Sequence, residues 1–304
     1  MPKINVEKLQ SLTGHKDCLY SIAAGNNKNT VFTSGGDGLV VQWDLENPGV
    51  GKMVAKVPNS IFAIHYSKEK NHLLIGHNFE GVHLLDLESK VEQKSAKITS
   101  SYIFDLKQIG SIIYCACGDG ILVLLHSDDL SVIKKIKISE KSLRSLSVNL
   151  DNNRLAIGCS DHSIYILNIK TLAIEKQILG HTNSVFTVCY HPNGAYLISS
   201  GRDAHIKIWD TESYELKEEI VAHLYAINHL VFSPDHSYFA SCSMDKSIKI
   251  WDAENFRLLK VIDKARHAGH GTSVNKLLWS EDQNRLLSVS DDRSASIWDI
   301  QIDN

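Results

Sequence analysis

The sequence predicts an all-β fold in which one unit of about 42 residues recurs along the whole 304-residue chain. Three observations support this. A strand-ending Trp-Asp pair, or its equivalent, recurs at nearly constant spacing. Each unit contains four short apolar runs separated by turn residues, and a Gly-His pair opens several units. Units of this kind are typical of propeller blades. We therefore expect a seven-bladed β-propeller of four-stranded antiparallel blades.

Residues 180–210 show the unit most clearly. Apolar runs at residues 185–190, 196–200 and 205–210 are separated by His-Pro-Asn-Gly at 191–194 and Gly-Arg-Asp at 201–203. A fourth run, at residues 214–220, leads into the next unit. The pattern predicts four short strands joined by tight turns.

The spacing of the third strand carries the repeat through the chain. Its end recurs at intervals of 42, 40, 42, 42, 42 and 47 residues, at Trp43, Leu85, Leu125, Leu167, Trp209, Trp251 and Trp298. Three units also begin with Gly-His: Gly14-His15, Gly180-His181 and Gly269-His270. With these motifs the chain resembles the WD-repeat (Trp-Asp repeat) β-propeller family over its whole length. The repeat leaves no stretch for a second domain, so residues 1–304 are expected to form one propeller domain.

The two ends of the chain complement each other. Residues 4–12 have the position of an outermost strand but no unit of their own, and the last unit stops after its third strand. We expect the N-terminal strand to complete the C-terminal blade and so to close the ring, as the resemblance also implies. An open stack would leave two unpaired faces and strand edges, which invite aggregation.

A set of four polar residues recurs in units 1, 5, 6 and 7. In the family that the chain resembles, such a His, Ser or Thr, Asp and Trp form a buried hydrogen-bonded chain. Which of two neighbouring hydroxyls takes part, Thr33 or Ser34 and Ser199 or Ser200, is open at this point. The matching sets are His15/Thr33/Asp37/Trp43, His181/Ser199/Asp203/Trp209, His223/Ser241/Asp245/Trp251 and His270/Ser288/Asp292/Trp298.

The chemistry of these sets suits a structural role. A buried Asp needs donors, a His supplies one and needs a Ser or Thr partner, and the indole N–H can end the chain. Ser, His and Asp also invite a catalytic interpretation, but four copies suit a structural device, and a nucleophile needs an exposed site. We expect no catalytic residues and no enzyme activity.

Units 2, 3 and 4 depart from the pattern. Val57, Thr99 and Ser139 stand where His is expected, leucines replace Trp, and Phe79 replaces the turn Asp of unit 2. We expect these three blades to be held by apolar contacts rather than by the polar chain.

A binding surface is expected where the innermost strands begin. The resemblance places the residue five positions after each His, or its equivalent, at the channel mouth on the face of the Gly-His loops. Aromatic rings and an arginine there suit a peptide carrying a cation or a carboxylate. The alternative is that the rings only fill space between blades. The candidates are Tyr20, Phe62, Phe104, Arg144, Phe186, Asn228 and Asn275.

Two further features fall on the same face. Arg202 precedes a turn Asp and either adds to a positive edge or is a solvated surface charge. The loop at residues 263–271 is longer by five residues and places His267 three residues before His270. Because His270 belongs to a polar set, we expect neither a metal site nor a cofactor.

Composition limits the function classes. A net charge of −3 argues against general affinity for nucleic acids. The first ten residues have no apolar signal core and no apolar run could span a bilayer, so we expect no membrane partner and a cytoplasmic location. The six cysteines have no disulfide-like spacing and are expected to be buried thiols.

Three functions remain open. The resemblance favours a non-enzymatic scaffold that binds a protein or peptide partner at the rim of the Gly-His face. An enzyme, or a binder of metal or small ligands, would use the central channel. A purely architectural subunit would bind through the disc edge or the opposite face, where the loop at residues 47–51 is expected.

Overall fold

The computed structural model describes residues 3–280 and 285–303. Within them the strands form seven four-stranded sheets, which we call blades 1 to 7. The chain divides into two compact units. The central unit is Phe62–Ile227, with blades 2 to 5, and the terminal unit is Met1–Ile61 with Asn228–Asn304, which carries blades 6, 7 and 1. That the whole chain is one domain stays a prediction.

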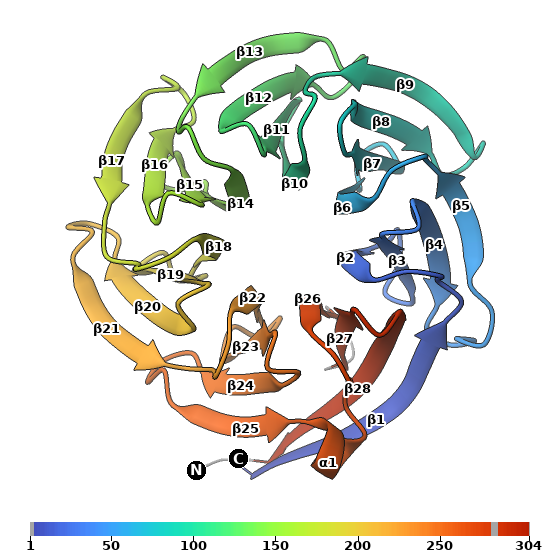
Figure 1. Cartoon of the computed structure of the whole chain (residues 1–304), viewed down its shortest axis with the longest axis vertical. Helices are drawn as coiled ribbons and strands as arrows, with labels where there is room; N and C mark the ends of the chain where they lie inside the picture. Colours follow the sequence, from blue (N-terminus) through green and yellow to red (C-terminus); the bar gives the residue numbers. More distant parts are fainter. Residues whose placement is uncertain (1–2, 281–284, 304) are drawn as a thin grey trace. The chain divides into compact units, whose positions relative to one another are not determined.

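In the central unit each blade uses four consecutive strands, and Figure 1 shows the first strand of each at the inner end of its sheet and the fourth at the outer edge. The strands are β6 (Ile61–Ser67), β7 (His72–His77), β8 (Gly81–Asp86) and β9 (Val91–Lys97) in blade 2; β10 (Ile103–Ile109), β11 (Ile112–Cys117), β12 (Ile121–His126) and β13 (Val132–Lys137) in blade 3; β14 (Leu143–Asn149), β15 (Arg154–Cys159), β16 (Ile164–Asn168) and β17 (Ile174–Ile178) in blade 4; and β18 (Val185–Tyr190), β19 (Tyr196–Gly201), β20 (His205–Asp210) and β21 (Leu216–Val221) in blade 5.

The terminal unit contains the two ends of the chain. Its strands are β2 (Leu19–Ala24), β3 (Thr30–Gly35), β4 (Leu39–Asp44) and β5 (Lys52–Lys56) in blade 1; β22 (Ile227–Phe232), β23 (Tyr238–Ser243), β24 (Ile248–Asp252) and β25 (Leu258–Ile262) in blade 6; and β26 (Val274–Trp279), β27 (Arg285–Ser290), β28 (Ser294–Asp303) and β1 (Lys3–Thr13) in blade 7. Strand β1 pairs antiparallel with β28, side by side in Figure 1. The prediction that the N-terminal strand completes the last blade is confirmed.

Within each unit the core consists of apolar layers between neighbouring blades. The middle strands are covered on both faces, which is why β11, with the sequence IIYCAC, is almost continuously apolar and buried. Leu124 of blade 3 and Ile157 of blade 4, for example, belong to one buried cluster. The fourth strands are covered on one side only, and β13, with the sequence VIKKIK, is largely exposed. These layers fix the positions of the first strands, which carry the candidate site.

The long loop before blade 7 contains a short helix, α1 (Lys264–His267). Asp263 caps it by accepting a hydrogen bond from the backbone nitrogen of Arg266 at 2.9 Å. In the part of the chain that the structure describes, no helix is long and apolar enough to cross a membrane.

Candidate functional site: an aromatic and arginine cluster

The polar sets of blades 1, 5 and 7 form hydrogen-bonded chains. In blade 1, His15 Nδ1 lies 2.9 Å from Asp37 Oδ2, and His15 Nε2 lies 2.9 Å from Thr33 Oγ1. Trp43 Nε1 donates to the same hydroxyl at 2.8 Å, so the partner is Thr33 and not Ser34. The corresponding distances are 2.7, 2.7 and 2.8 Å for His181–Asp203, His181–Ser199 and Trp209–Ser199, and 2.8, 2.8 and 2.9 Å for His270–Asp292, His270–Ser288 and Trp298–Ser288.

In blade 6 the tryptophan and the turn aspartate are also hydrogen-bonded. Trp251 Nε1 donates to Ser241 Oγ at 2.9 Å, and Asp245 accepts hydrogen bonds from the backbone and hydroxyl of Ser247. His223 is buried.

Blades 3 and 4 keep a polar link that the sequence analysis did not expect. Thr99 Oγ1 donates to Asp119 Oδ2 at 2.8 Å, and Ser139 Oγ donates to Asp161 Oδ2 at 2.6 Å. Tyr165 also donates to Asp161, at 2.7 Å. A hydroxyl therefore replaces the imidazole as the donor to the turn carboxylate, and apolar contacts alone do not describe these blades.

The hydroxyls of the full chains have no access to a substrate. Thr33, Ser199 and Ser288 are each 0% exposed. A serine or threonine nucleophile must reach a substrate carbonyl, so the geometry suits turn stabilisation rather than acyl transfer.

An aromatic cluster lies at the start of the first strands of blades 2 and 3. Phe62 and Phe104, each the second residue of its strand, stack with ring centroids 5.6 Å apart and an interplanar angle of 5°. The Tyr102 ring lies 5.6 Å from Phe62 and 5.5 Å from Phe104, and the Phe79 ring lies 4.7 Å from Tyr102. Phe62 and Phe104 are half-buried, whereas Phe79 and Tyr102 are each 40% exposed. The cluster thus presents aromatic surface to solvent.

Arg144 extends this cluster into blades 4 and 5. Its guanidinium carbon lies 3.9 Å from the Phe104 ring centroid and 4.6 Å from that of Phe186. Both contacts lie within the range of cation–π attraction. We call Phe62, Phe79, Tyr102, Phe104, Arg144 and Phe186 the aromatic–arginine cluster; all six lie in the central unit.

Phe79 and Tyr102 were missed in the sequence analysis as binding residues. Phe79 was noted there only as a replacement for a turn Asp. It has a left-handed backbone with φ of 69°, which is unusual for a bulky residue. Its backbone nitrogen donates to Ser101 O at 2.7 Å, next to Tyr102. An aromatic residue in a tight turn was the available signal, but its ring contact with Tyr102 is not visible in the sequence.

The candidates in the terminal unit are engaged in internal hydrogen bonds. Asn228 Nδ2 donates to Val274 O at 2.8 Å, and Asn275 Nδ2 donates to Leu19 O at 2.8 Å. Burial, with the Cys18 thiol beside it, raises the pKa of Tyr20 to about 12. The side-chain amides of Asn228 and Asn275 therefore link blades 6, 7 and 1 to one another by hydrogen bonds.

Arg202 lies apart from these contacts. It is exposed, and its backbone nitrogen donates to Ser184 O at 2.9 Å. We keep it outside the aromatic–arginine cluster.

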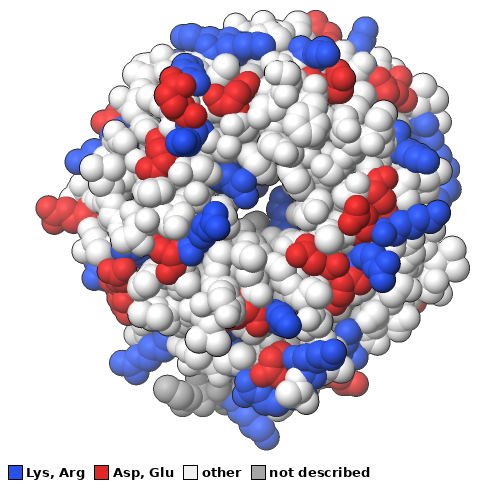
Figure 2. All heavy atoms as spheres, viewed as in Figure 1, with Lys and Arg blue, Asp and Glu red and all other residues white. Residues whose placement is uncertain are grey.

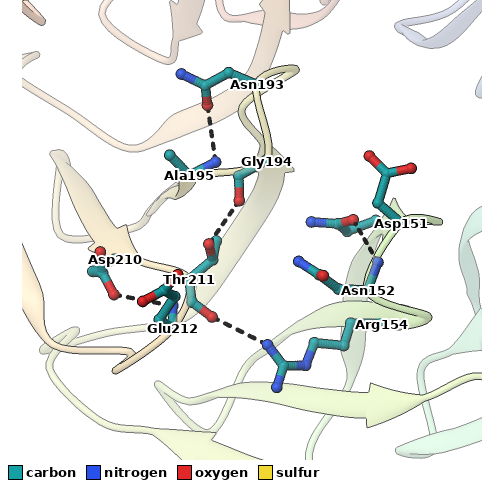
Figure 3. Close-up of a pocket in the computed structure, with 10 residues that line it drawn as sticks. Asp151, Asn152, Arg154, Asn193, Gly194, Ala195, Asp210, Thr211 and Glu212 are labelled. Carbon is teal, nitrogen blue, oxygen red and sulfur yellow. Dashed lines mark hydrogen bonds between the residues drawn. The ribbon is translucent and has the colours of Figure 1, made fainter.

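A separate pocket of about 640 Å³ lies at the other end of blades 4 and 5. Figure 3 shows its walls, which come from the turns around Asn152, Gly194 and Thr211. The polar groups mostly serve the turns themselves: Thr211 Oγ1 donates to Gly194 O at 2.6 Å, and Arg154 Nη1 donates to Thr211 O at 3.1 Å. This pocket is best explained as turn structure.

Charge and metal-ligand chemistry add no further site. Figure 2 shows Lys and Arg side chains interspersed with Asp and Glu over the face that it views. Among the residues with described positions, no group of three or more His, Cys, Asp or Glu could hold a metal ion.

Comparison with known proteins places this geometry in a family. The crystal structure of the WD40 β-propeller domain of Doa1 is similar, with a TM-score of 0.86, 18% sequence identity and coverage of 97% of each chain. At this identity the likeness shows the fold: a seven-bladed β-propeller of four-stranded antiparallel sheets, counted over the described residues. The sequence profile "WD domain, G-beta repeat" matches residues 6–44, 173–210, 214–252 and 263–299, about half of the chain.

The chain belongs to the WD-repeat family. WD-repeat propellers generally act as protein-interaction scaffolds and are typically not catalytic. The matched segments of this WD-repeat protein contain the full polar sets, whereas residues 45–172 lie outside every match. Phe62, Phe79, Tyr102, Phe104 and Arg144 all lie in that unmatched stretch. The part that departs most from the repeat therefore carries most of the aromatic–arginine cluster.

Proposed function

We propose that this WD-repeat protein is a non-enzymatic scaffold that binds a protein or peptide partner through the aromatic–arginine cluster, on the face of the Gly-His loops. The observation that carries the proposal is the exposed pair Phe79 and Tyr102, which continues into the half-buried rings of Phe62 and Phe104. Rigid aromatic side chains with accessible area are the residues on which protein interfaces most depend.

The turn of blade 2 bears on the same proposal through the side chain of Phe79. It places Phe79 at φ of 69°, and the matching turns also have a residue with positive φ: Gly38 and Gly120 in blades 1 and 3, and His162, Ala204, Lys246 and Arg293 in blades 4 to 7. A residue other than glycine in this conformation costs stability, of the order of 1–3 kcal/mol. What distinguishes the blade 2 turn is its side chain, because the Phe79 ring is 40% exposed and its centroid lies 4.7 Å from that of Tyr102.

The mixed charges on the face that Figure 2 views, together with the net charge of −3, argue against a nucleic-acid partner. All six cysteines are free thiols, which agrees with our proposal of a cytoplasmic location. Fractionation of the native cell, with the protein detected by antibody, tests that location.

A double variant tests the proposed surface. Phe79→Asn keeps a residue that tolerates left-handed φ, and Tyr102→Ala removes the neighbouring ring. The protein and its variants are used as bait in a lysate of the native organism, and bound proteins are quantified by mass spectrometry. We expect the double variant to lose the partners that the wild-type protein retains, with its thermal unfolding broadly unchanged.

The matched control is Leu150→Ala, which removes an apolar side chain that is 63% exposed at the opposite end of β14 from Arg144. We expect it to retain the partners. To place the partner on the surface directly, Tyr102 or Leu150 is replaced by p-benzoylphenylalanine and cross-linked. Equal capture by the double variant, or cross-linking from position 150 alone, would refute the surface.

A further inference from the structure

Arg144 is a cation without a hydrogen-bonded acceptor among the residues that the structure describes; its contacts there are with the rings of Phe104 and Phe186. A guanidinium carries five N–H donors and no acceptor. Ring contacts engage its flat faces and leave the donors at its edge to other groups. The side chain is half-buried, so part of it reaches solvent.

The surroundings do not compensate this charge. Burial lowers the pKa of Arg144 to about 10, so the side chain is still protonated at neutral pH. Asp105, which follows Phe104 in the chain, is already committed: its two carboxylate oxygens accept the backbone N–H groups of Leu106 and Leu146 at 3.0 and 2.9 Å. Partly buried charges in proteins are usually paired. An anion on a bound partner would supply the acceptor that Arg144 lacks among the described residues.

We propose that Arg144 binds the side-chain carboxylate of an Asp or Glu in the partner's docking segment, while a nearby apolar side chain of that segment rests on Tyr102 and Phe79. This inference rests on the proposed function, because it assigns the chemistry of the partner at the same surface. The ring contacts lead without interruption from Arg144 through Phe104 to Tyr102 and Phe79.

Charge and shape both favour a carboxylate. Its two oxygens and single negative charge match the planar fork and single positive charge of one guanidinium. A phosphate carries about −1.5 to −2 charges at neutral pH and would need further cations. Phe104 and Phe186 hold the fork in place, so less conformational entropy is lost on binding.

The test selects ligands without assuming their sequence. A phage-displayed library of random dodecapeptides is passed over the immobilised full-length protein, with the Phe79→Asn/Tyr102→Ala variant as the counter-selection. We expect enrichment of Asp or Glu close to an aromatic or aliphatic residue. The best peptide is synthesised with its acid intact and with that acid changed to the amide, and its affinity is measured by calorimetry.

Either removal of charge is expected to weaken binding by at least about tenfold: the acid-to-amide change in the peptide, or Arg144→Gln in the protein. Combining them is expected to add little, because both remove one interaction. Arg257→Gln, which changes an exposed arginine, is the matched control and is expected to bind normally. The peptide change uses the wild-type protein, so the outcome does not depend on the folding of Arg144→Gln.

The outcomes separate the two proposals. Peptides that need Phe79 and Tyr102 but bind equally well as amides would overturn the carboxylate assignment and leave the docking surface standing. A phosphoserine version of the peptide that binds more tightly than the carboxylate version would also overturn the carboxylate assignment without affecting the docking surface. If no peptide sequence is enriched relative to the counter-selection, the docking surface itself is refuted. The carboxylate assignment, which depends on that surface, is then refuted as well.

Discussion

Thr99 donates a hydrogen bond to Asp119 over 2.8 Å, in a blade that has no histidine at the corresponding loop position. The Thr99 hydroxyl takes the position that the His imidazole has in blades 1, 5 and 7, and it donates to the equivalent turn carboxylate. A single hydroxyl can therefore supply one hydrogen bond of the full His, Ser or Thr, Asp and Trp chain, namely the one to the turn carboxylate.

This contact predicts the effect of Thr99→Val, which removes the hydroxyl but keeps the branched shape of a buried side chain. We expect a loss of roughly 1.5–3 kcal/mol in the free energy of unfolding, as for hydrogen bonds to charged partners. Thr99→Ser, which keeps the hydroxyl, is expected to lose much less. Urea denaturation followed by circular dichroism measures both, and equal stability of the two variants would show that the hydrogen bond contributes nothing.

Trp209→Ala tests the polar chain of blade 5. Trp209 is 3% exposed and donates to Ser199, so we expect destabilisation of about 3–5 kcal/mol, typical of deleting a large buried aromatic side chain. Trp209→Phe removes the indole N–H but keeps an apolar ring, and should fall between wild type and Trp209→Ala. The measurement is denaturant unfolding; a loss below about 1 kcal/mol for Trp209→Ala would reject the structural role.

Acid is expected to destabilise the protein in two stages. Burial lowers the pKa of His15 below its ordinary value of 6.5, so the unfolded chain binds this proton first and stability falls as the pH drops below 6.5. Burial alone would raise the pKa of Asp203, but the His181 hydrogen bond and charge outweigh it and the pKa lies below 3.8. Its contribution is complete above 3.8 and is lost as the pH falls further.

Urea denaturation between pH 3 and pH 8 checks this profile. We expect a small loss of stability from pH 7 to pH 5 and a steeper one below about pH 4. Asp203→Asn should reduce the pH dependence of the free energy of unfolding below about pH 4. Asp151→Asn, which changes an exposed carboxylate, should leave that pH dependence unchanged. A profile that is flat from pH 7 to pH 3 would contradict the assignment.

Gly120→Ala tests how tightly the turn of blade 3 is closed. Gly120 has φ of +78°, and a Cβ built on it would lie 1.9 Å from the Ser139 carbonyl oxygen. Gly110 also has positive φ, +55°, but faces open space. We expect Gly110→Ala to cost about 1 kcal/mol from backbone strain and Gly120→Ala clearly more, because the carbonyl must also move. Equal melting temperatures of the two variants would contradict this.

Sequence reasoning predicted the blades because their signals are local. The strand expected at residues 185–190 is β18, and that expected at 205–210 is β20. The fourth strand of blade 5 starts later than predicted: Tyr214 has φ of 59° and belongs to the turn before β21. Alternation, turn residues and the Trp spacing are each read within one unit, so each of these predictions needed no knowledge of distant residues.

The aromatic–arginine cluster was only partly predictable from the sequence, because it depends on contacts between units of the repeat. Phe62, Phe104 and Arg144 follow from counting positions in the repeat, but Tyr102 lies outside the counted position. Its contact with Phe79 joins a turn of blade 2 to a loop before blade 3. Such contacts depend on how two blades pack and on side-chain rotamers, neither of which a single repeat specifies.

The pairing of β1 with β28 has a consequence for biosynthesis. Lys3 is aligned with Asp303 and Thr13 with Ser294, so β1 acquires its neighbour only after β28, which follows it by six other blades of sequence, has been translated. Until then a nascent chain carries a long strand with bare amide groups, open to adventitious pairing with other polypeptides. Deletions in β1 or in β28 therefore act on the same sheet, and a permuted chain in which β1 follows β28 directly would let this blade assemble from consecutive strands.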